Sequence, residues 1–169
     1  MTARPEVWLR GPVAGVPAPL QPVAHALLQA VEDVDRVVAT LDGERLHRRP
    51  GGAASVAFHV RHAAGALDRL CTYAEGRPLD DAQRRALVAE GSGDEGGAEL
   101  LDRFRASVEG ALAQLRRTDP AALPAPRTIG RAALPTTVLG LLYHAGEHTA
   151  RHTGQAITTA KAINGMETR

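Results

Sequence analysis

Apolar residues recur at intervals of three and four through four long segments, and this spacing constrains the fold more than any other feature of the sequence. On an α-helix it places the apolar side chains on one face, which has to be buried against a partner. We expect long helices over residues 21–41, 54–74, 98–117 and 135–162, and a short helix over residues 80–89. No segment shows a strand pattern that competes with these helices. The expected fold class is therefore all-α, a four-helix bundle.

Proline and glycine mark the connections between the expected helices. Residues 1–19 predict an extended N-terminal arm with three adjacent apolar residues as its anchor, Val7, Trp8 and Leu9. Residues 118–134 contain three prolines that exclude helix, so they predict a long connection. Asn164–Gly165 is the expected end of the last helix. We expect residues 1–169 to form a single domain.

Charge and composition exclude several classes of partner. The formal net charge is +1 with neutral histidines, and the aromatic residues are one Trp, two Tyr and two Phe. This balance gives no reason to expect a nucleic acid or a membrane surface as partner. Cys71 is the one cysteine, which excludes an internal disulfide and fits a reducing cytoplasm. We expect a cytoplasmic protein without a signal peptide or a membrane span, with Cys71 as a small core residue.

Histidine spacing points to a metal ion. Five of the seven histidines lie in two clusters, one on each of two expected helices: His59 and His62, and His144, His148 and His152. Residues four apart on a helix differ by about 40° in direction and about 6 Å in height, so two such imidazoles can point at one ion. Bundles build metal sites from facing helices, and neutral imidazole is a good ligand for zinc, nickel, iron or copper. The spacing predicts a metal site at His148 and His152, with His59 or His62 as a third ligand.

A second motif overlaps the last cluster. Residues 144–148 match H-x-x-E-H, the inverted zinc-peptidase signature, in which Glu147 would be a general base. The motif has only three fixed positions. The simpler interpretation of Glu147 is an ion pair with Arg151, four residues further along the helix. We favour the ion pair over the peptidase.

Two stretches resemble known family motifs. Residues 55–65, which include His59 and His62, resemble the second-helix motif of the DinB-like family, also called the YfiT-like metal-dependent hydrolase superfamily. Residues 147–155 resemble its last-helix motif, H-x-x-x-H-x-G-Q. The turn at residues 50–52 also fits. One departure is Ala54, which stands where the family commonly has tryptophan.

This resemblance implies an up-down-down-up four-helix bundle that is often a homodimer. It implies one divalent metal ion, zinc or nickel in most cases, with His62, His148 and His152 as the ligands. His59 remains the alternative to His62, because it lies nearer the centre of the apolar stripe whereas His62 lies at the margin.

Further residues on the last helix are candidates for roles around the metal. His144 and Glu147 are the candidate catalytic or ligand-orienting residues. Candidates for lining a pocket are Tyr143, Arg151 and Gln155.

The resemblance implies a class of chemistry but does not specify one reaction. Known activities of the family include transferases and isomerases that use a low-molecular-weight thiol. Metal-activated hydrolysis is a second possibility. A non-enzymatic metal- or ligand-binding stress protein is the alternative, and a structural protein with incidental histidines is the third. In the enzyme interpretation the partner is a small-molecule substrate.

Overall fold

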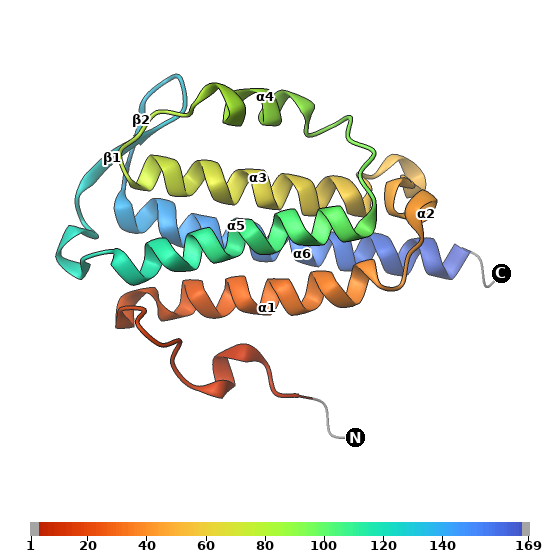
Figure 1. The fold of residues 1–169 in the computed structure, drawn as a ribbon, viewed down its shortest axis with the longest axis horizontal. Helices are drawn as coiled ribbons and strands as arrows, with labels where there is room; N and C mark the ends of the chain where they lie inside the picture. Colours follow the sequence, from red (N-terminus) through yellow and green to blue (C-terminus); the bar gives the residue numbers. More distant parts are fainter. Residues whose placement is uncertain (1–3, 167–169) are drawn as a thin grey trace.

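Four long helices lie side by side in the computed structural model, which describes residues 4–166 (Figure 1). They are α1 (Gln21–Val38), α3 (Val56–Ala74), α5 (Gly97–Arg117) and α6 (Val138–Met166). Helices α1 and α6 run in one direction and α3 and α5 in the other. The expected up-down-down-up bundle is confirmed. None of the helices among the described residues is long and apolar enough to cross a membrane.

Because α3 and α5 run in the same direction, the chain must return along the whole bundle between them. This return contains the short helix α4 (Asp81–Ala89), which lies over the outside of α3 (Figure 1). The Asp80 side chain caps α4 by accepting a hydrogen bond from the backbone N–H of Gln83, and the Gln83 side chain bonds back to Asp80. Apart from its C-cap, Glu90, the helix has no buried residue, so packing constrains it little.

The core lies between the four long helices, and α3 packs against both α5 and α6. Each large apolar side chain buried there contributes about 1.5–3 kcal/mol. The largest of the fully buried side chains are Phe104, Leu20, Leu27, Leu46, Leu67, Leu100, Leu115, Leu142 and Ile163. Apart from Leu20, Leu46 and Ile163, these residues lie within the four long helices that the spacing predicts.

Helix α3 begins at a side-chain cap. The Ser55 hydroxyl accepts a hydrogen bond of 3.1 Å from the backbone N–H of Phe58, which otherwise has no partner within the helix. The preceding turn, Pro50–Gly52, has positive φ at Gly51 and Gly52, a conformation that suits glycine. The cap and the turn together fix the start of α3, and hence the direction in which its histidines point.

The first long helix is shorter than expected. It ends at Val38 and not near residue 41, because Thr40 and Leu41 donate to carbonyls three residues back and close a tight turn. Asp42 then caps a further short helix, α2 (Gly43–His47), by accepting from the N–H of Arg45. Gly43 is therefore the first residue of a helix.

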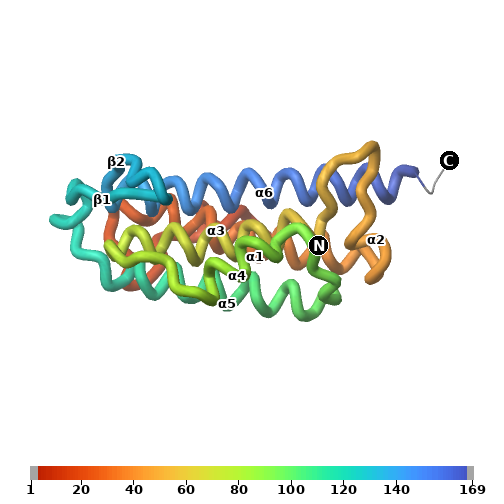
Figure 2. The backbone as a smooth tube through the Cα atoms, turned by 90° about the horizontal axis from the view of Figure 1, so that it is seen from above, coloured from red at the N-terminus to blue at the C-terminus, as the bar shows by residue number. Residues whose placement is uncertain are grey.

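The expectation of no strands is wrong. β1 (Pro126–Ile129) and β2 (Leu134–Thr137) pair antiparallel at the end of the bundle, and the last long helix begins at Val138 and not at Pro135 (Figure 2). Both strands contain a proline, which cannot donate to a strand ladder. A two-stranded sheet consists only of edge strands, so each proline nitrogen can face away from the partner strand.

The end of the last helix also differs. Helix α6 continues through Asn164 and Gly165 to Met166. The Asn164 side chain accepts a hydrogen bond from Arg45 of α2. This tertiary contact holds a residue that, on its own, favours the end of a helix.

The N-terminal arm keeps one of its three expected anchors, and its residues 1–3 lie outside the described part. Val7 is 6% exposed, whereas Trp8 and Leu9 are 61% and 59% exposed. The three residues belong to one tight turn, Val7–Arg10, so their side chains point in different directions. The arm is fixed to α1 by polar contacts as well, because Gln29 accepts from the N–H of Val7 at 3.0 Å.

Candidate metal site between helices α3 and α6

Three imidazoles converge where α3 packs against α6. One nitrogen from each of His62, His148 and His152 lies within 4.8 Å of the others, so the cluster could hold a metal ion. The Nε2 atoms of His62 and His148 are 3.0 Å apart. Two nitrogen ligands around one tetrahedral zinc ion stand about 3.4 Å apart. The spacing in the structure thus needs only a small adjustment to fit an ion.

The third ring closes the group. The His152 ring centroid lies 4.5 Å from those of both His62 and His148. All three side chains are half-buried. The cluster is therefore partly exposed to solvent. We refer to these three residues as the histidine cluster.

His59 contacts the histidine cluster without belonging to it. Its side chain is 7% exposed, and its Nδ1 atom is 3.1 Å from Nδ1 of His152. This agrees with its expected place near the centre of the apolar stripe, with His62 at the margin. The contact lets His59 orient the His152 ring by a hydrogen bond.

Two of the three imidazoles, those of His148 and His152, are electrically neutral at neutral pH. Burial, together with the neighbouring rings of His62, His148 and His59, lowers the pKa of His152 to about 4. Burial and the His62 ring also lower the pKa of His148. Neutral rings keep a lone pair for a metal, and a cation can be accepted without displacing a proton. The donor set therefore fits a divalent transition metal.

Glu90 is a residue of the site that the sequence did not reveal. It is the C-cap of α4. The Nδ1 atom of His62 donates to Oε2 of Glu90 at 2.7 Å, and Arg69 donates to its other oxygen at 2.5 Å. Burial alone would raise the pKa of Glu90, but the hydrogen bonds from His62 and Arg69 outweigh it and hold the pKa below its usual value. Glu90 is therefore a carboxylate.

A second pair of buried charged residues, Arg61 and Glu95, adjoins Glu90 and Arg69. Arg61 binds both carboxylate oxygens of Glu95, with 2.7 Å from its Nε to Oε1, and donates to the backbone oxygen of Glu90 at 2.7 Å. The side chains of Arg61 and Glu95 are 7% and 8% exposed. We call Arg61, Arg69, Glu90 and Glu95 the ion-pair network.

One aromatic side chain next to the histidine cluster was also not predicted from the sequence. Phe58 stacks on the His62 ring, with the planes 8° apart and the centroids at 5.5 Å. It lies one turn before His62 on α3, so the spacing of four was the available signal. This packing restricts rotation of the His62 ring.

The outer face of α6 carries the remaining candidates. Arg151 donates to Glu147 at 2.9 Å from its Nε atom, and the Nδ1 atom of His144 is 3.3 Å from the same carboxylate. The hydrogen bond from Arg151 lowers the pKa of Glu147. The ion pair favoured from the sequence is confirmed. Tyr143 and Gln155 are exposed and are not members of the histidine cluster.

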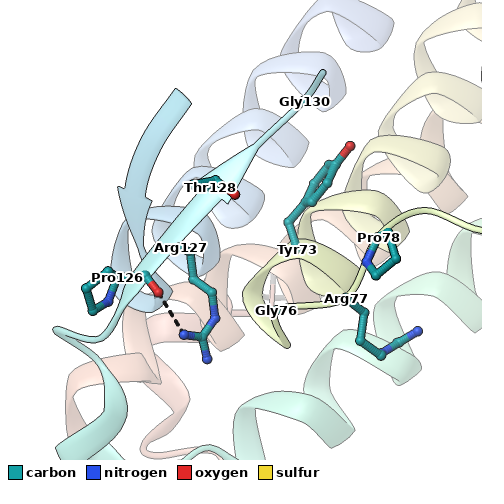
Figure 3. Close-up of a pocket in the computed structure, with 8 residues that line it drawn as sticks. All are labelled: Tyr73, Gly76, Arg77, Pro78, Pro126, Arg127, Thr128 and Gly130. Carbon is teal, nitrogen blue, oxygen red and sulfur yellow. Dashed lines mark hydrogen bonds between the residues drawn. The ribbon is translucent and has the colours of Figure 1, made fainter. Parts of the chain in front are cut away.

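A hollow of about 550 Å³ lies at the hairpin end of the bundle, between the end of α3 and β1 (Figure 3). Arg127 borders it and donates to the carbonyl oxygens of Ala74 and Pro126 at 2.9 and 2.8 Å. Carbonyls at a helix end lack partners within the helix, so this arginine stabilises the end of α3. None of the residues that line this hollow is a histidine, and it is separate from the candidate metal site.

Fold and site together define a class, a four-helix bundle with a half-buried histidine cluster between two of its helices. The model of the DinB superfamily matches residues 26–156, and this chain belongs to that superfamily. The fold resembles the crystal structure of a conserved protein from Enterococcus faecalis, with a TM-score of 0.72 and 20% identity over 85% of this chain and 95% of that one. No curated protein matches the chain.

Proposed function

We propose that the chain binds one divalent metal ion, zinc or nickel, through His62, His148 and His152. One observation supports this above all: three imidazoles from two facing helices place nitrogen atoms within 4.8 Å of one another. His62 is preferred to His59 because His62 belongs to this group, whereas His59 contacts the group through the Nδ1 atom of His152. Three protein ligands are the number typical of catalytic zinc sites.

The reaction that we propose is metal-dependent and acts on a small molecule. A bound divalent metal lowers the pKa of a coordinated thiol or water and so supplies a nucleophile at neutral pH. Transfer or isomerisation with a low-molecular-weight thiol is the leading form, since the resemblance implies it, and hydrolysis is the second. The half-buried rings support access of such a substrate.

A non-enzymatic metal- or ligand-binding protein is the second candidate. The observation that favours it is the state of Glu147, the candidate general base, which is tied to Arg151. The peptidase is not proposed, because H-x-x-E-H requires the first histidine as a ligand. His144 is not a member of the histidine cluster.

Elemental analysis tests the metal assignment. The double variant His148→Ala/His152→Ala should lose stoichiometric metal, because two of three ligands are removed. His144→Ala is the matched control, since this histidine lies one turn away on the same helix and is exposed. Retention of a full equivalent of metal by the double variant would refute the assignment.

The mass of the products distinguishes the enzyme hypothesis from the hypothesis of a non-enzymatic binding protein. Metal-loaded protein is incubated with low-molecular-weight thiols and an electrophile, and conversion is compared with that by His148→Ala/His152→Ala. Metal-dependent conversion by the wild type alone supports the enzyme. Equal conversion by both proteins contradicts it and leaves the binding protein as the function.

The homodimer and the cytoplasmic location stay predictions. A candidate surface for the homodimer is a hollow of about 580 Å³ on α1 and the arm, bordered by Trp8, Pro22 and His25. Trp8 is 61% exposed there.

A further inference from the structure

We propose that Glu90 is a positioning residue that presents His62 to the metal ion. This inference rests on the proposed function, because it concerns one of the three proposed ligands. It assigns to the crossover between α3 and α5 a part in the site that the two histidine motifs do not contain.

The first step concerns the proton on His62. A carboxylate only accepts hydrogen bonds, so the 2.7 Å contact with Glu90 places the ring proton on Nδ1. The other nitrogen, Nε2, then keeps its lone pair, and this is the atom that faces His148 at 3.0 Å. Glu90 thus selects the tautomer in which the metal-binding nitrogen points into the cluster, and its negative charge strengthens that nitrogen as a donor.

The second step concerns the position of Glu90 itself. Its side chain is 9% exposed, and Arg69 holds the oxygen that does not face His62. Gly65 makes room for this contact: a Cβ atom there would lie 2.6 Å from Oε1 of Glu90 and 2.8 Å from Nη1 of Arg69. Glycine inside a helix costs about 1 kcal/mol relative to alanine. The close approach of Glu90 and Arg69 gives a physical reason for that glycine.

The third step is a contrast among the three ligands. Nδ1 of His152 meets the imidazole of His59, and Nδ1 of His148 is buried without a hydrogen-bond partner among the described residues. His62 is the one of the three whose ring is held by an anion. The loss of that anion should therefore affect His62 more than packing alone would.

Glu95 provides the matched control. It lies five residues from Glu90 on the same crossover, is buried to the same degree and is also bound to an arginine of α3, Arg61. Its hydrogen bonds and ion pairs within the described residues join it to Arg61, Arg103 and His47, none of which belongs to the histidine cluster. A role of Glu90 that is only structural predicts the same behaviour for both glutamates.

The experiment compares Glu90→Gln with Glu95→Gln by zinc affinity, measured by competition with a chelator. Glu90→Gln should weaken zinc binding 10- to 100-fold, the usual effect of removing such a partner, whereas Glu95→Gln should stay within about threefold of the wild type. Equal losses, or wild-type affinity in Glu90→Gln, would overturn the proposal. If Glu90→Gln does not fold, Glu90→Asp replaces it: this variant keeps the buried charge but shortens its reach to His62, and it should weaken zinc binding more than Glu95→Gln does.

Nitrogen NMR of the histidine rings in metal-free protein separates this inference from the proposed function. The wild type and Glu95→Gln should show His62 with its proton on Nδ1, and Glu90→Gln should show a mixture of tautomers. If the wild type binds no zinc, the proposed function fails. The inference fails on its own account if zinc binds and the tautomer of His62 is the same in all three proteins.

Discussion

Helix α3 carries two buried polar groups side by side, and they are stabilised in different ways. In the ion-pair network every charge meets an opposite charge, as Arg61 meets Glu95 and Arg69 meets Glu90. In the histidine cluster the rings meet one another, and burial keeps His148 and His152 neutral. Burial thus lowers the pKa values of His148 and His152 in the histidine cluster. In the ion-pair network the cost of burial is offset by the pairing of opposite charges.

This difference indicates that the ion-pair network is structural and that the histidine cluster can bind an ion. A paired network is complete in itself and gains nothing from a further ion. Converging neutral imidazoles have lone pairs that a cation can use. The two groups meet at Glu90, which belongs to the ion-pair network and also holds His62.

The largest effect is expected from breaking the network. Arg61→Met leaves Glu95 buried with only the half-exposed Arg103 beside it, at 2.9 Å. Breaking a buried pair usually costs 3–5 kcal/mol, and with Arg103 remaining we expect about 3 kcal/mol of lost unfolding free energy. Urea unfolding of the metal-free protein measures it.

The control for this change is Arg103→Met, which removes the exposed partner of the same carboxylate. It should cost less than about 1 kcal/mol. If Arg61→Met and Arg103→Met lower the free energy of unfolding equally, the network does not contribute as a buried pair.

A smaller effect is expected from pH, and it should separate the two groups. The folded pKa of His152 is about 4, below the ordinary value of 6.5, so the unfolded chain takes up the proton first. Stability is then fully present above pH 6.5 and is lost as pH falls toward 4. The expected loss in metal-free protein is on the order of 2 kcal/mol. Glu90 and Glu95, whose pKa values lie below 4.5, add their own loss only at lower pH.

Unfolding curves between pH 7 and pH 4 in the presence of a chelator check this. His152→Gln should flatten the dependence between pH 6.5 and pH 5, and His144→Gln should leave it as in the wild type. A slope that is unchanged in His152→Gln would contradict the lowered pKa of His152.

The smallest effect is expected on the outer face of α6. Glu147→Gln removes an exposed ion pair with Arg151 and should change the free energy of unfolding by less than about 0.5 kcal/mol. Zinc affinity should also stay within about threefold, because Glu147 is not a member of the cluster. A large loss of zinc affinity would show that Glu147 contributes to the metal site. Arg151→Met, the other half of the pair, is the control.

The sequence predicted the helices well because long apolar stripes specify both the helix and its buried face. Spacing within one helix also predicted His148 and His152 as a pair, whereas His62 as the third member of the cluster was implied by the family resemblance. Glu90 could not be found in this way. It lies 28 residues from His62, and the path of the crossover brings the two together.

The hairpin was missed for a local reason. Each strand has only four residues and contains a proline, Pro126 or Pro135, so the pattern that usually marks a strand is absent. The pairing depends on the bundle end against which it lies, where the N–H of Val138 reaches the carbonyl of Ala125. The exposure of Trp8 likewise depends on how the arm lies on α1.

The contact between His62 and His148 joins positions that are 86 residues apart in the chain. A metal ion held by both would close a loop of that length and act as a reversible cross-link. By analogy with a disulfide, closing such a loop removes conformational entropy from the unfolded chain worth on the order of 4 kcal/mol. The ion would then govern how long the protein survives unfolding and proteolysis, as well as any chemistry at the site.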